Sequence, residues 1–347
     1  MKFIRDILND NEAALIFLPE NRRYLTGFNS SLGYYLITKS TDCLFVDGRY
    51  YSAAKSGASA GSIVLLKNIA EQLKNLLEEH KVERMLVERE NRYCDIDVFK
   101  RLPISVVVSE RLSDSLKKAR AIKSEAEVAN IKSALKIAEQ ALEATLPFIK
   151  AGRTEIEVAA FLEYEMRKRG SEETAFKTIC LTGAKTALPH GEPDQTVIKD
   201  GDAVLIDFGA TVNGYRSDIT RTFCVGGCSD EFKAAYEAVR RAGEAGFGKL
   251  AGGCPLKIAD EAAREAFGEY EPYFTHSLGH GVGLDIHEAP TLSYKAEGYL
   301  AEGNIVTVEP GVYFDGKFGI RIEDMAYIEK NGARNLTQFS KNLTILA

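Results

Sequence analysis

The sequence predicts an α+β domain preceded by a smaller α/β domain, and three observations lead to this fold class. The chain has 347 residues, which is long for one domain and sufficient for two. Its first part alternates short β-rich runs with helical stretches, whereas its later strands group into hairpins between long helices. The segment 113–124, SDSLKKARAIKS, is basic and short of bulky apolar residues. We therefore place the boundary there and expect domains at residues 1–118 and 119–347.

The smaller domain is predicted to consist of short strands and at least one clear helix. Its strands are runs of aliphatic, aromatic and β-branched residues, and the third run ends at the turn sequence Asp47-Gly48. Residues 69–80 repeat apolar side chains at helical spacing, so a helix is predicted there. The predicted strands are residues 14–18, 34–37, 43–46, 85–87 and 104–108.

The larger domain opens with a long helix, predicted over residues 125–148, whose apolar residues form one stripe. Thr154 and Glu157 then form a capping box for the next helix, which Gly170 terminates. Because the strands that follow group into hairpins, we expect an antiparallel sheet covered by helices on one face. The further predicted helices are 231–250 and 256–267, and the predicted strands are 204–208, 218–225, 305–309, 319–323 and 324–329.

Composition and charge exclude several classes of protein. The formal net charge is −6 and no basic run is present, which argues against a nucleic-acid-binding surface. No segment approaches the roughly 20 apolar residues of a membrane span. The opening MKFIRDILNDNEAAL has acids and amides where a signal peptide is apolar. We therefore expect a cytoplasmic protein that binds neither nucleic acid nor membrane, and whose six scattered cysteines are reduced.

The most informative segment is VLIDFGATVNGYRSDITRTF, residues 204–223, in which two aspartates flank an Asn-Gly turn. Asn213-Gly214 is the preferred sequence of a two-residue type I′ hairpin. A hairpin closed there pairs residue 207 with residue 220, so Asp218 becomes a diagonal neighbour of Asp207 on the same face. Two inward-facing carboxylates repel each other and are costly to bury unless a cation lies between them. The pattern therefore predicts a divalent-cation site.

Further candidate ligands and catalytic groups lie on both sides of this hairpin in the sequence. Three histidines fall in HSLGHGVGLDIHE, where glycines let the backbone approach closely. Glu309 ends a predicted strand, and alternation in the next strand places Arg321 and Glu323 on one face. The negative charges of four strand carboxylates balance two divalent cations. Together with one glycine-flanked histidine, these carboxylates form a donor set that suits Mn²⁺, Co²⁺, Fe²⁺ or Zn²⁺. The candidate histidines are His190, His276, His280 and His287.

Each of these features has a plainer structural explanation when it is taken alone. A strand aspartate beside a turn is more often a capping or exposed residue. A histidine near glycines is usually a loop residue with satisfied hydrogen bonds, and Arg321 beside Glu323 could be an ordinary ion pair. A structural explanation must, however, account for several charged residues that interrupt apolar strands in one chain. A shared metal site accounts for all of them.

Five motifs of the larger domain are similar to those of a known family. They are ALPHG (187–191), DFGATVNGYRSDITRTF (207–223), HSLGHGVGLDIHE (276–288), VEPGVY (308–313) and GIRIED (319–324). They resemble the pita-bread metallopeptidases, and within them the Xaa-Pro peptidases aminopeptidase P and prolidase. The bridging segment RAIKSEAEV and, in the smaller domain, YLTGF and DGRYY also resemble this family. The resemblance implies a pita-bread catalytic domain preceded by an α/β domain of the creatinase/prolidase N-terminal type.

The resemblance also implies roles for individual residues. Two divalent metal ions, with Mn²⁺ favoured and Co²⁺, Fe²⁺ or Zn²⁺ as alternatives, would share a bridging hydroxide that acts as the nucleophile. Glu309, itself a metal ligand, would be the general base, and His190 and His287 would bind substrate and shuttle protons. His276 and Arg321 match further active-site residues. The implied metal ligands are Asp207, Asp218, His280, Glu309 and Glu323.

The activity implied by the resemblance is hydrolysis of the bond between an N-terminal residue and a following proline. This bond is a tertiary amide without an N–H, so recognition must use the proline ring, the α-amino group and the carbonyl. Chain length and the compact first domain favour an Xaa-Pro aminopeptidase, expected as a homodimer, and an Xaa-Pro dipeptidase (prolidase) is the alternative. A methionine aminopeptidase usually lacks the leading domain. A creatinase-like hydrolase or a non-catalytic pita-bread binding module would lack the metal ligands, which are intact here.

Overall fold

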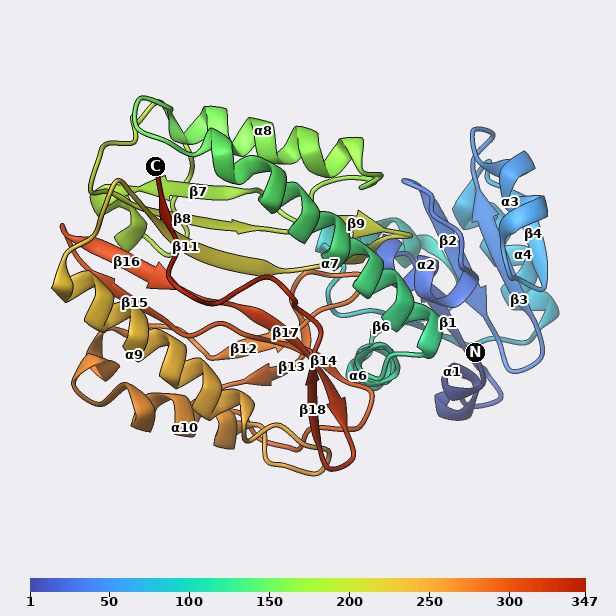
Figure 1. The fold of residues 1–347 in the computed structure, drawn as a ribbon. Helices are drawn as coiled ribbons and strands as arrows, with labels where there is room; N and C mark the ends of the chain where they lie inside the picture. The colour runs from blue at the N-terminus through green and yellow to red at the C-terminus, as the bar shows by residue number, and fades with distance from the viewer. The chain divides into compact units, whose positions relative to one another are not determined.

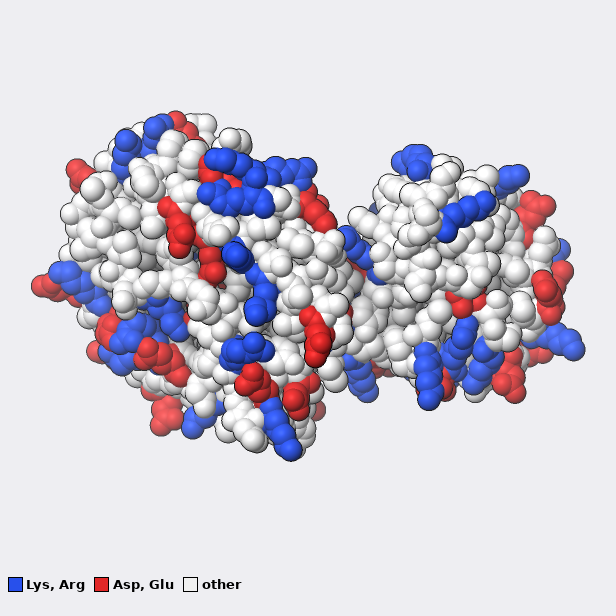
Figure 2. Space-filling view, turned by 45° about the vertical axis from the view of Figure 1, so that its right-hand side comes forward, with Lys and Arg blue, Asp and Glu red and all other residues white.

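The structure is a computed structural model that describes residues 1–347. It divides into two compact units, unit 1 (Met1–Arg120) and unit 2 (Ala121–Ala347). Unit 1 carries the blue and cyan colours in Figure 1, and unit 2 runs from green to red. No helix in either unit combines the length and the apolar character that crossing a bilayer requires. On the face shown in Figure 2, acidic and basic side chains are interspersed.

Unit 1 contains a six-stranded sheet with the strand order β4-β3-β2-β1-β5-β6. The sheet is mixed, because β1 pairs antiparallel with β2 and parallel with β5. Every residue of β1 is buried, as expected for a central strand covered on both faces. The strands are β1 (Glu12–Ile16), β2 (Gly33–Ile37), β3 (Asp42–Val46), β4 (Ser62–Leu65), β5 (Arg84–Val87) and β6 (Ser105–Val108).

Two separate apolar clusters lie on the two faces of this sheet. Successive side chains of a strand point to opposite faces, so Ala13 and Leu15 join one cluster and Ala14 and Ile16 join the other. Helix α4 packs into the first cluster and helix α6 into the second. The helices are α1 (Lys2–Ile7), α2 (Pro19–Thr26), α3 (Tyr51–Gly57), α4 (Ile69–Glu79), α5 (Tyr93–Asp97), η1 (Val98–Arg101) and α6 (Glu110–Ala121).

The strands and the helix that the sequence predicts for unit 1 are all present, with ends shifted by two residues or fewer. The short helices α1, α2, α3, α5 and η1 and strand β4 were not predicted, because elements of four to eight residues are too short to show a clear apolar period. The basic segment 113–124 mostly forms helix α6, in which Leu112 and Leu116 are buried.

Unit 2 is built around two sheets rather than the single sheet expected. One has the strand order β19-β11-β8-β7 and the other β13-β12-β14-β17-β18, and two small sheets pair β9 with β10 and β15 with β16. The pairings are antiparallel apart from β11 with β19, which confirms the hairpin-rich α+β class. The strands are β7 (Ile179–Thr182), β8 (Ala203–Phe208), β9 (Thr211–Val212), β10 (Tyr215–Arg216), β11 (Ile219–Val225), β12 (Gly279–Gly281), β13 (Glu288–Leu292), β14 (Ile305–Val308), β15 (Gly311–Phe314), β16 (Phe318–Arg321), β17 (Asp324–Glu329), β18 (Gly332–Asn335) and β19 (Ile345–Leu346).

Two pairs of helices cover these sheets, α7 and α8 on one side and α9 and α10 on the other (Figure 1). The first pair shares an apolar cluster with β8 and β11, and the second pair shares one with β14 and β16. Thr154 and Glu157 form the predicted capping box of α8, and Ser124 and Glu127 form another at the start of α7. The helices are α7 (Glu125–Thr145), η2 (Leu146–Phe148), α8 (Glu155–Lys168), η3 (Gly183–Ala187), α9 (Asp230–Phe247), α10 (Lys257–Phe267) and η4 (Gly268–Tyr273).

The hairpin around Asn213-Gly214 has the predicted register. Asp207 of β8 pairs with Thr220 of β11. Asn213 and Gly214 have φ values of 48° and 75°, the positive values that a type I′ turn requires at both central positions. Asp207 and Asp218 therefore approach each other on one face, as the sequence predicts.

Candidate active site

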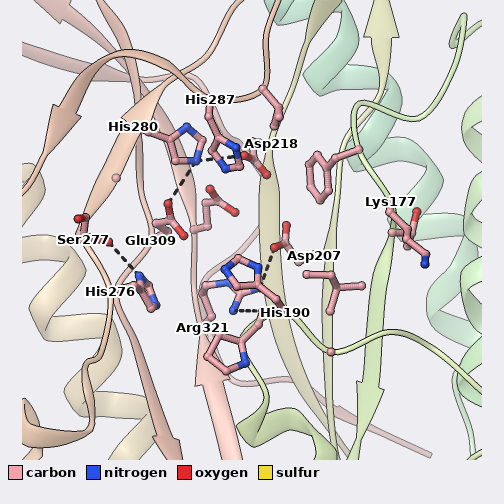
Figure 3. A pocket seen from close by; sticks show the side chains of 18 of the residues that line it. Lys177, His190, Asp207, Asp218, His276, Ser277, His280, His287, Glu309 and Arg321 are labelled. Carbon is pink, nitrogen blue, oxygen red and sulfur yellow. Dashed lines mark hydrogen bonds and ion pairs between the residues drawn. The ribbon is translucent and has the colours of Figure 1, made fainter. Parts of the chain in front are cut away.

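Unit 2 contains a cavity of about 560 Å³ that is lined by residues of both sheets. The structure places every residue that the sequence singles out around this one cavity, although these residues span more than a hundred positions. Figure 3 shows the side chains of Asp207, Asp218, Glu309 and His280 directed toward a common space. The singled-out residues that line the cavity are His190, Asp207, Asp218, His276, His280, His287, Glu309, Arg321 and Glu323.

The β8–β11 hairpin delivers the first two carboxylates. Asp207 lies near the end of β8, and Asp218 stands one residue before β11. The chain segments of the hairpin lie very close together here, since a Cβ atom at Gly209 would lie only 1.8 Å from the carbonyl oxygen of Ser217. Asp207 Oδ2 accepts a hydrogen bond of 2.7 Å from Arg321 Nη2, whereas Asp207 Oδ1 is buried without a hydrogen-bond partner.

Strands β12 and β14 deliver His280 and Glu309. A Cβ atom at Gly279 would lie 2.0 Å from the carbonyl oxygen of Thr307, so only glycine permits this close approach. His280 Nε2 lies 3.3 Å from Glu309 Oε1 and 3.6 Å from Asp218 Oδ2. Glu309 directly follows β14 rather than ending it. Its N–H still donates to Leu278 O at 2.8 Å, and the strand pairing cannot continue through Pro310, which lacks an N–H.

Glu323 lies where the chain crosses between two sheets. The sequence predicts a strand over residues 319–323, but β16 ends at Arg321 in one sheet and β17 starts at Asp324 in another. Thr220 holds Glu323 at this crossing, because its carbonyl accepts the Glu323 N–H at 3.1 Å and its Oγ1 donates to Glu323 Oε2 at 2.8 Å. Ligand atoms of Asp218, His280 and Glu323 lie within 4.8 Å of one another, a group that could hold a metal ion.

The buried carboxylates of this group are poorly compensated by the chain itself. Burial raises the pKa of Asp218 and Glu323 well above their ordinary values, and repulsion from neighbouring carboxylates raises both further. Burial likewise raises the pKa of Glu309 to about 8. Arg321 is the single guanidinium lining the cavity, and it is bound to Asp207. An acidic donor set of this kind, with one imidazole, is chemically suited to divalent cations.

Apart from His280, the histidines of the cavity fall into two classes. The ring nitrogens of His276 lie 2.9 Å from Ser277 O and 2.9 Å from the Tyr313 hydroxyl, and burial lowers its pKa to about 4. By contrast, neither His190 nor His287 has a ring hydrogen bond to another residue of the chain. Burial lowers the pKa of His287, and the nearby His190 lowers it further. The rings of His190 and His287 therefore have nitrogens available for a ligand.

Family profiles identify both parts of the chain. The profile of metallopeptidase family M24 matches residues 129–330, a range that includes all of the singled-out residues. The chain belongs to metallopeptidase family M24. The profile of the creatinase/prolidase N-terminal domain matches residues 4–131. This M24 metallopeptidase therefore combines a pita-bread domain with a creatinase/prolidase-type N-terminal domain, and the fold expected from the motifs is confirmed.

Relatives of this M24 peptidase carry two kinds of name. An Xaa-Pro dipeptidase from Pyrococcus furiosus is 37% identical over 343 residues, which cover 97% of each chain. The solved structure of an Xaa-Pro dipeptidase from Bacillus anthracis is 35% identical with a TM-score of 0.95, covering 99% of this chain and 98% of that one. The solved structure of an X-Pro aminopeptidase from Thermotoga maritima is 36% identical with a TM-score of 0.87, covering 96% and 95%.

Two residues that organise the site of this M24 peptidase were not singled out from the sequence. Tyr313 accepts a hydrogen bond of 2.8 Å from Arg321 Nη1 and also contacts His276. Thr220 accepts one of 3.1 Å from Arg321 Nε. Strand alternation could have identified Thr220, because it shares a face with Asp218. Tyr313 lies on β15, a strand that the sequence analysis did not predict.

Proposed function

We propose that this M24 metallopeptidase uses two divalent metal ions to hydrolyse the peptide bond between an N-terminal residue and a following proline. The observation that supports this proposal most strongly is the convergence of four carboxylates and one imidazole on a single cavity. The chain supplies only Arg321 against these charges, and Arg321 bonds one carboxylate oxygen of Asp207. The remaining negative charge calls for bound cations. The proposed ligands are Asp207, Asp218, His280, Glu309 and Glu323.

The residues present fit such a metal pair. Four carboxylates match the charge of two divalent cations, and a cation would satisfy Asp207 Oδ1, which is buried without a hydrogen-bond partner. Carboxylates with one imidazole suit Mn²⁺, which we propose as the native metal, with Co²⁺, Fe²⁺ or Zn²⁺ as alternatives. When bound, such metals polarise a carbonyl oxygen and lower the pKa of a water nucleophile to near neutrality.

Three side chains are assigned to proton transfer and substrate binding. Glu309 Oε1 lies 3.3 Å from both Thr307 Oγ1 and His280 Nε2, a position from which its carboxylate can take the proton of the attacking water. His190 and His287 have unengaged ring nitrogens in the cavity, so they can donate a hydrogen bond to the substrate carbonyl or deliver a proton to the departing proline nitrogen. His276 is bonded at both nitrogens, and we assign it to orienting Tyr313.

Among Xaa-Pro substrates, we propose a preference for peptides longer than two residues. A dipeptide places a free carboxylate directly after the proline, and that carboxylate needs a cationic partner. Lys177 and Arg321 are the Lys and Arg residues that line the cavity of unit 2. Arg321 is bound to Asp207. Lys177 pairs with Glu192 at 2.6 Å, and the side chains of Lys177 and Glu192 are mostly exposed. Figure 3 shows Lys177 away from the carboxylate group.

The test compares kcat/KM for an Xaa-Pro dipeptide, an Xaa-Pro-Yaa tripeptide and a matched Xaa-Ala-Yaa tripeptide, each with Mn²⁺ present. We expect the Xaa-Pro-Yaa tripeptide to be the best substrate and the alanine peptide to be cleaved poorly. Equal cleavage of the alanine and proline tripeptides would contradict proline specificity. No cleavage of any peptide by Mn²⁺-loaded protein would contradict the peptidase assignment.

The second candidate is an Xaa-Pro dipeptidase, and the names of the Pyrococcus and Bacillus relatives favour it. In that case the dipeptide would have the highest kcat/KM. Replacing Lys177 by Met then separates two origins of this preference. A selective loss of dipeptide cleavage would identify Lys177 as the partner of the free carboxylate, whereas an unchanged preference would place that partner elsewhere.

A further inference from the structure

Arg221 of β11 is the most voluminous fully buried side chain of the protein. Its side chain is only 1% exposed, which requires every N–H of the guanidinium to find an acceptor. The guanidinium has five N–H donors in one plane, and here five acceptors surround it. Nε donates to Ser340 O at 2.9 Å, Nη1 to Thr220 O at 2.9 Å and Glu323 O at 2.5 Å, and Nη2 to Phe339 O at 2.7 Å and Asp324 Oδ1 at 2.8 Å.

Two of these acceptors are the carbonyl of Glu323 itself and the carbonyl of Thr220, the residue that bonds Glu323. The Glu323 carbonyl accepts from Arg221, its N–H donates to Thr220 O, and its carboxylate accepts from Thr220 Oγ1. Glu323 has no strand pairing of its own, because it lies in the crossing between β16 and β17. These contacts therefore fix the spacing between Glu323 and Asp218, which immediately precedes β11.

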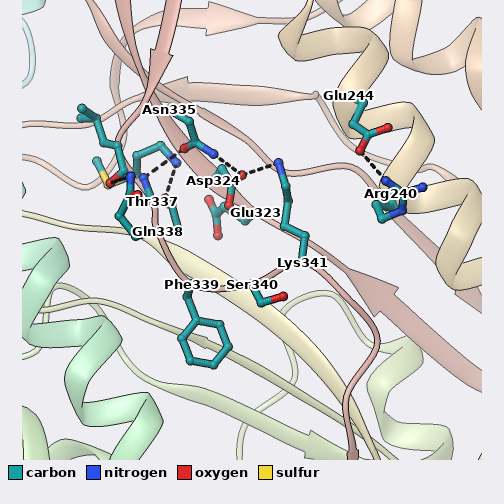
Figure 4. Close-up of polar contacts among 12 residues, drawn as sticks. Arg240, Glu244, Glu323, Asp324, Asn335, Thr337, Gln338, Phe339, Ser340 and Lys341 are labelled. Atoms are coloured by element: carbon teal, nitrogen blue, oxygen red, sulfur yellow. Dashed lines mark hydrogen bonds and ion pairs between the residues drawn. The ribbon is translucent and has the colours of Figure 1, made fainter.

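Asp324 accepts a hydrogen bond from the guanidinium and is itself held by two further partners. Its Oδ1 accepts from Arg221, and its Oδ2 accepts from Asn335 Nδ2 at 2.7 Å and Lys341 Nζ at 2.8 Å. Figure 4 shows Asn335 and Lys341 converging on Asp324, next to Glu323. The Asp324 side chain is 5% exposed, so its charge is held by these three partners rather than by water.

The segment Gln338–Lys341 provides the remaining contacts of the Arg221 guanidinium. It supplies the two carbonyls that bond the guanidinium, and the Phe339 ring centroid lies 5.8 Å from Arg221 Cζ. Glu139 of α7 in turn accepts the Phe339 N–H at 2.7 Å. Residues from β11, β17 and the C-terminal segment thus meet at one guanidinium, to which the Glu323 backbone is also bonded, and α7 holds the C-terminal segment through Glu139.

We propose that Arg221 is a positioning residue for the metal centre, which holds Glu323 through its backbone carbonyl. This inference rests on the proposed role of Glu323 as a metal ligand. Lysine cannot replace arginine in this role, because an ammonium has three donors around one atom and cannot span five acceptors in a plane. Replacing Arg221 should therefore loosen Glu323 and weaken metal binding while every ligand remains present.

The test measures binding of Mn²⁺ alone to the full-length metal-free protein by isothermal titration calorimetry. Arg221→Lys should weaken Mn²⁺ binding by about 10–100-fold, the scale seen when a group that orients a metal ligand is removed. Excess Mn²⁺ should restore most of kcat. Asp324→Asn leaves the five donors of Arg221 in place, so its Mn²⁺ affinity should fall between those of wild type and Arg221→Lys. This second variant serves equally well if Arg221→Lys does not fold.

Arg22→Lys is the matched control, because Arg22 is a buried arginine of unit 1 that also donates to carbonyl oxygens, those of Phe17 and Ser30. It should cost stability without changing Mn²⁺ affinity. Wild-type affinity in both Arg221→Lys and Asp324→Asn, or an equal loss in Arg22→Lys, would overturn the positioning role. Absence of Mn²⁺ binding by the wild type would instead overturn the proposed metal centre itself.

Discussion

Asp42 and Glu12 of unit 1 and the carboxylates of the unit 2 cavity are buried in opposite ways. In unit 1, Asp42 accepts hydrogen bonds from Arg5 Nη2 and the Tyr35 hydroxyl, both at 2.7 Å. Glu12 accepts the Asn9 N–H at 2.9 Å and is also bonded by Arg111. In the cavity of unit 2, neighbouring carboxylates repel one another, and this repulsion adds to burial in raising the pKa values of Asp218 and Glu323. The pKa values follow this difference, since that of Glu12 is lowered and that of Glu309 is raised to about 8.

The comparison distinguishes charge that serves folding from charge that awaits a ligand. A buried carboxylate with donors from its own chain is stable in the apo protein, because those donors replace the lost water. A cluster of buried carboxylates that repel one another lowers the stability of the apo protein, and a chain retains it where a cation compensates. The predictions below test this contrast, starting from the largest expected effect.

The largest effect is expected for Asp218→Ala. Asp218 faces His280 and Glu323 across the proposed metal site, so its loss removes a ligand and the charge stabilisation that the metals supply. Several kcal/mol of such stabilisation correspond to a fall of about 10³-fold or more in kcat/KM. Metal content should fall as well, measured by elemental analysis of the dialysed protein.

The control is Asp230→Ala, an aspartate of unit 2 with a 99% exposed side chain. It should retain both metal content and activity. An Asp218→Ala variant that keeps its metals and cleaves Xaa-Pro peptides at the wild-type rate would show that the cavity carboxylates do not serve to bind catalytic metals.

The next effect concerns the histidines with unengaged rings. His287→Ala should lower kcat by about 10²–10⁴-fold, the usual contribution of a proton-transferring group, and should leave the metal content unchanged. His80→Ala, in unit 1, removes the histidine that lies outside the cavity and should have no effect on kcat. Loss of metal from His287→Ala would make His287 a ligand and would contradict the assigned role.

The parts of this site that depend on local sequence could be predicted. The Asn213-Gly214 turn fixes the register of its hairpin, and that register alone brings Asp207 and Asp218 together. The place where Glu323 leaves its strand was not predictable, because the alternation of apolar and polar residues continues through Glu323, at the end of the predicted strand 319–323. Only long-range pairing separates β16 from β17, and long-range pairing has no local signal.

The same limit explains why Arg221 and Tyr313 were not singled out as organising residues. Arg221 reads as an ordinary strand residue in the motif SDITRTF, and four of its five acceptors lie more than a hundred positions away in the segments 323–324 and 339–340. Burial of a charged side chain becomes visible only when the chain is folded. Motifs thus identified the groups that face the cavity, whereas the groups that hold them in place emerged from the three-dimensional contacts.

Metal removal should also lower the stability of the fold, and this effect is smaller than the loss of activity that accompanies it. Repulsion among the buried carboxylates lowers the stability of the apo protein, so Mn²⁺ that binds only the folded state should raise the unfolding temperature. At a free Mn²⁺ concentration of 100 times the dissociation constant, the gain is about 2.7 kcal/mol. Differential scanning calorimetry with and without a chelator measures it, and Asp218→Ala should show a smaller shift. An identical shift in wild type and Asp218→Ala would place the bound metal outside the cavity.

The smallest effect concerns Glu12. It tests whether donors of the chain itself compensate the buried carboxylates of unit 1. The Glu12 side chain is 1% exposed. Burial opposes ionisation of Glu12, but the Asn9 N–H and Arg111 outweigh burial and lower its pKa below 4.5. A lowered folded-state pKa stabilises the fold above the unfolded pKa, and this contribution is lost as the pH falls through the folded pKa. Glu12→Gln should therefore destabilise the protein at pH 7 and progressively less below pH 4.5.

The expected loss at pH 7 is about 1 kcal/mol, because Arg84 and Arg111 are half-exposed and water screens their charges. Urea unfolding followed by circular dichroism measures it, since the chain has no tryptophan to report by fluorescence. Activity and Mn²⁺ affinity should not change, because Glu12 belongs to unit 1 and bonds only within it. A loss of stability that is the same at pH 7 and pH 4 would show that the charge of Glu12 contributes nothing. The contrast between compensated and uncompensated carboxylates would then rest on unit 2 alone.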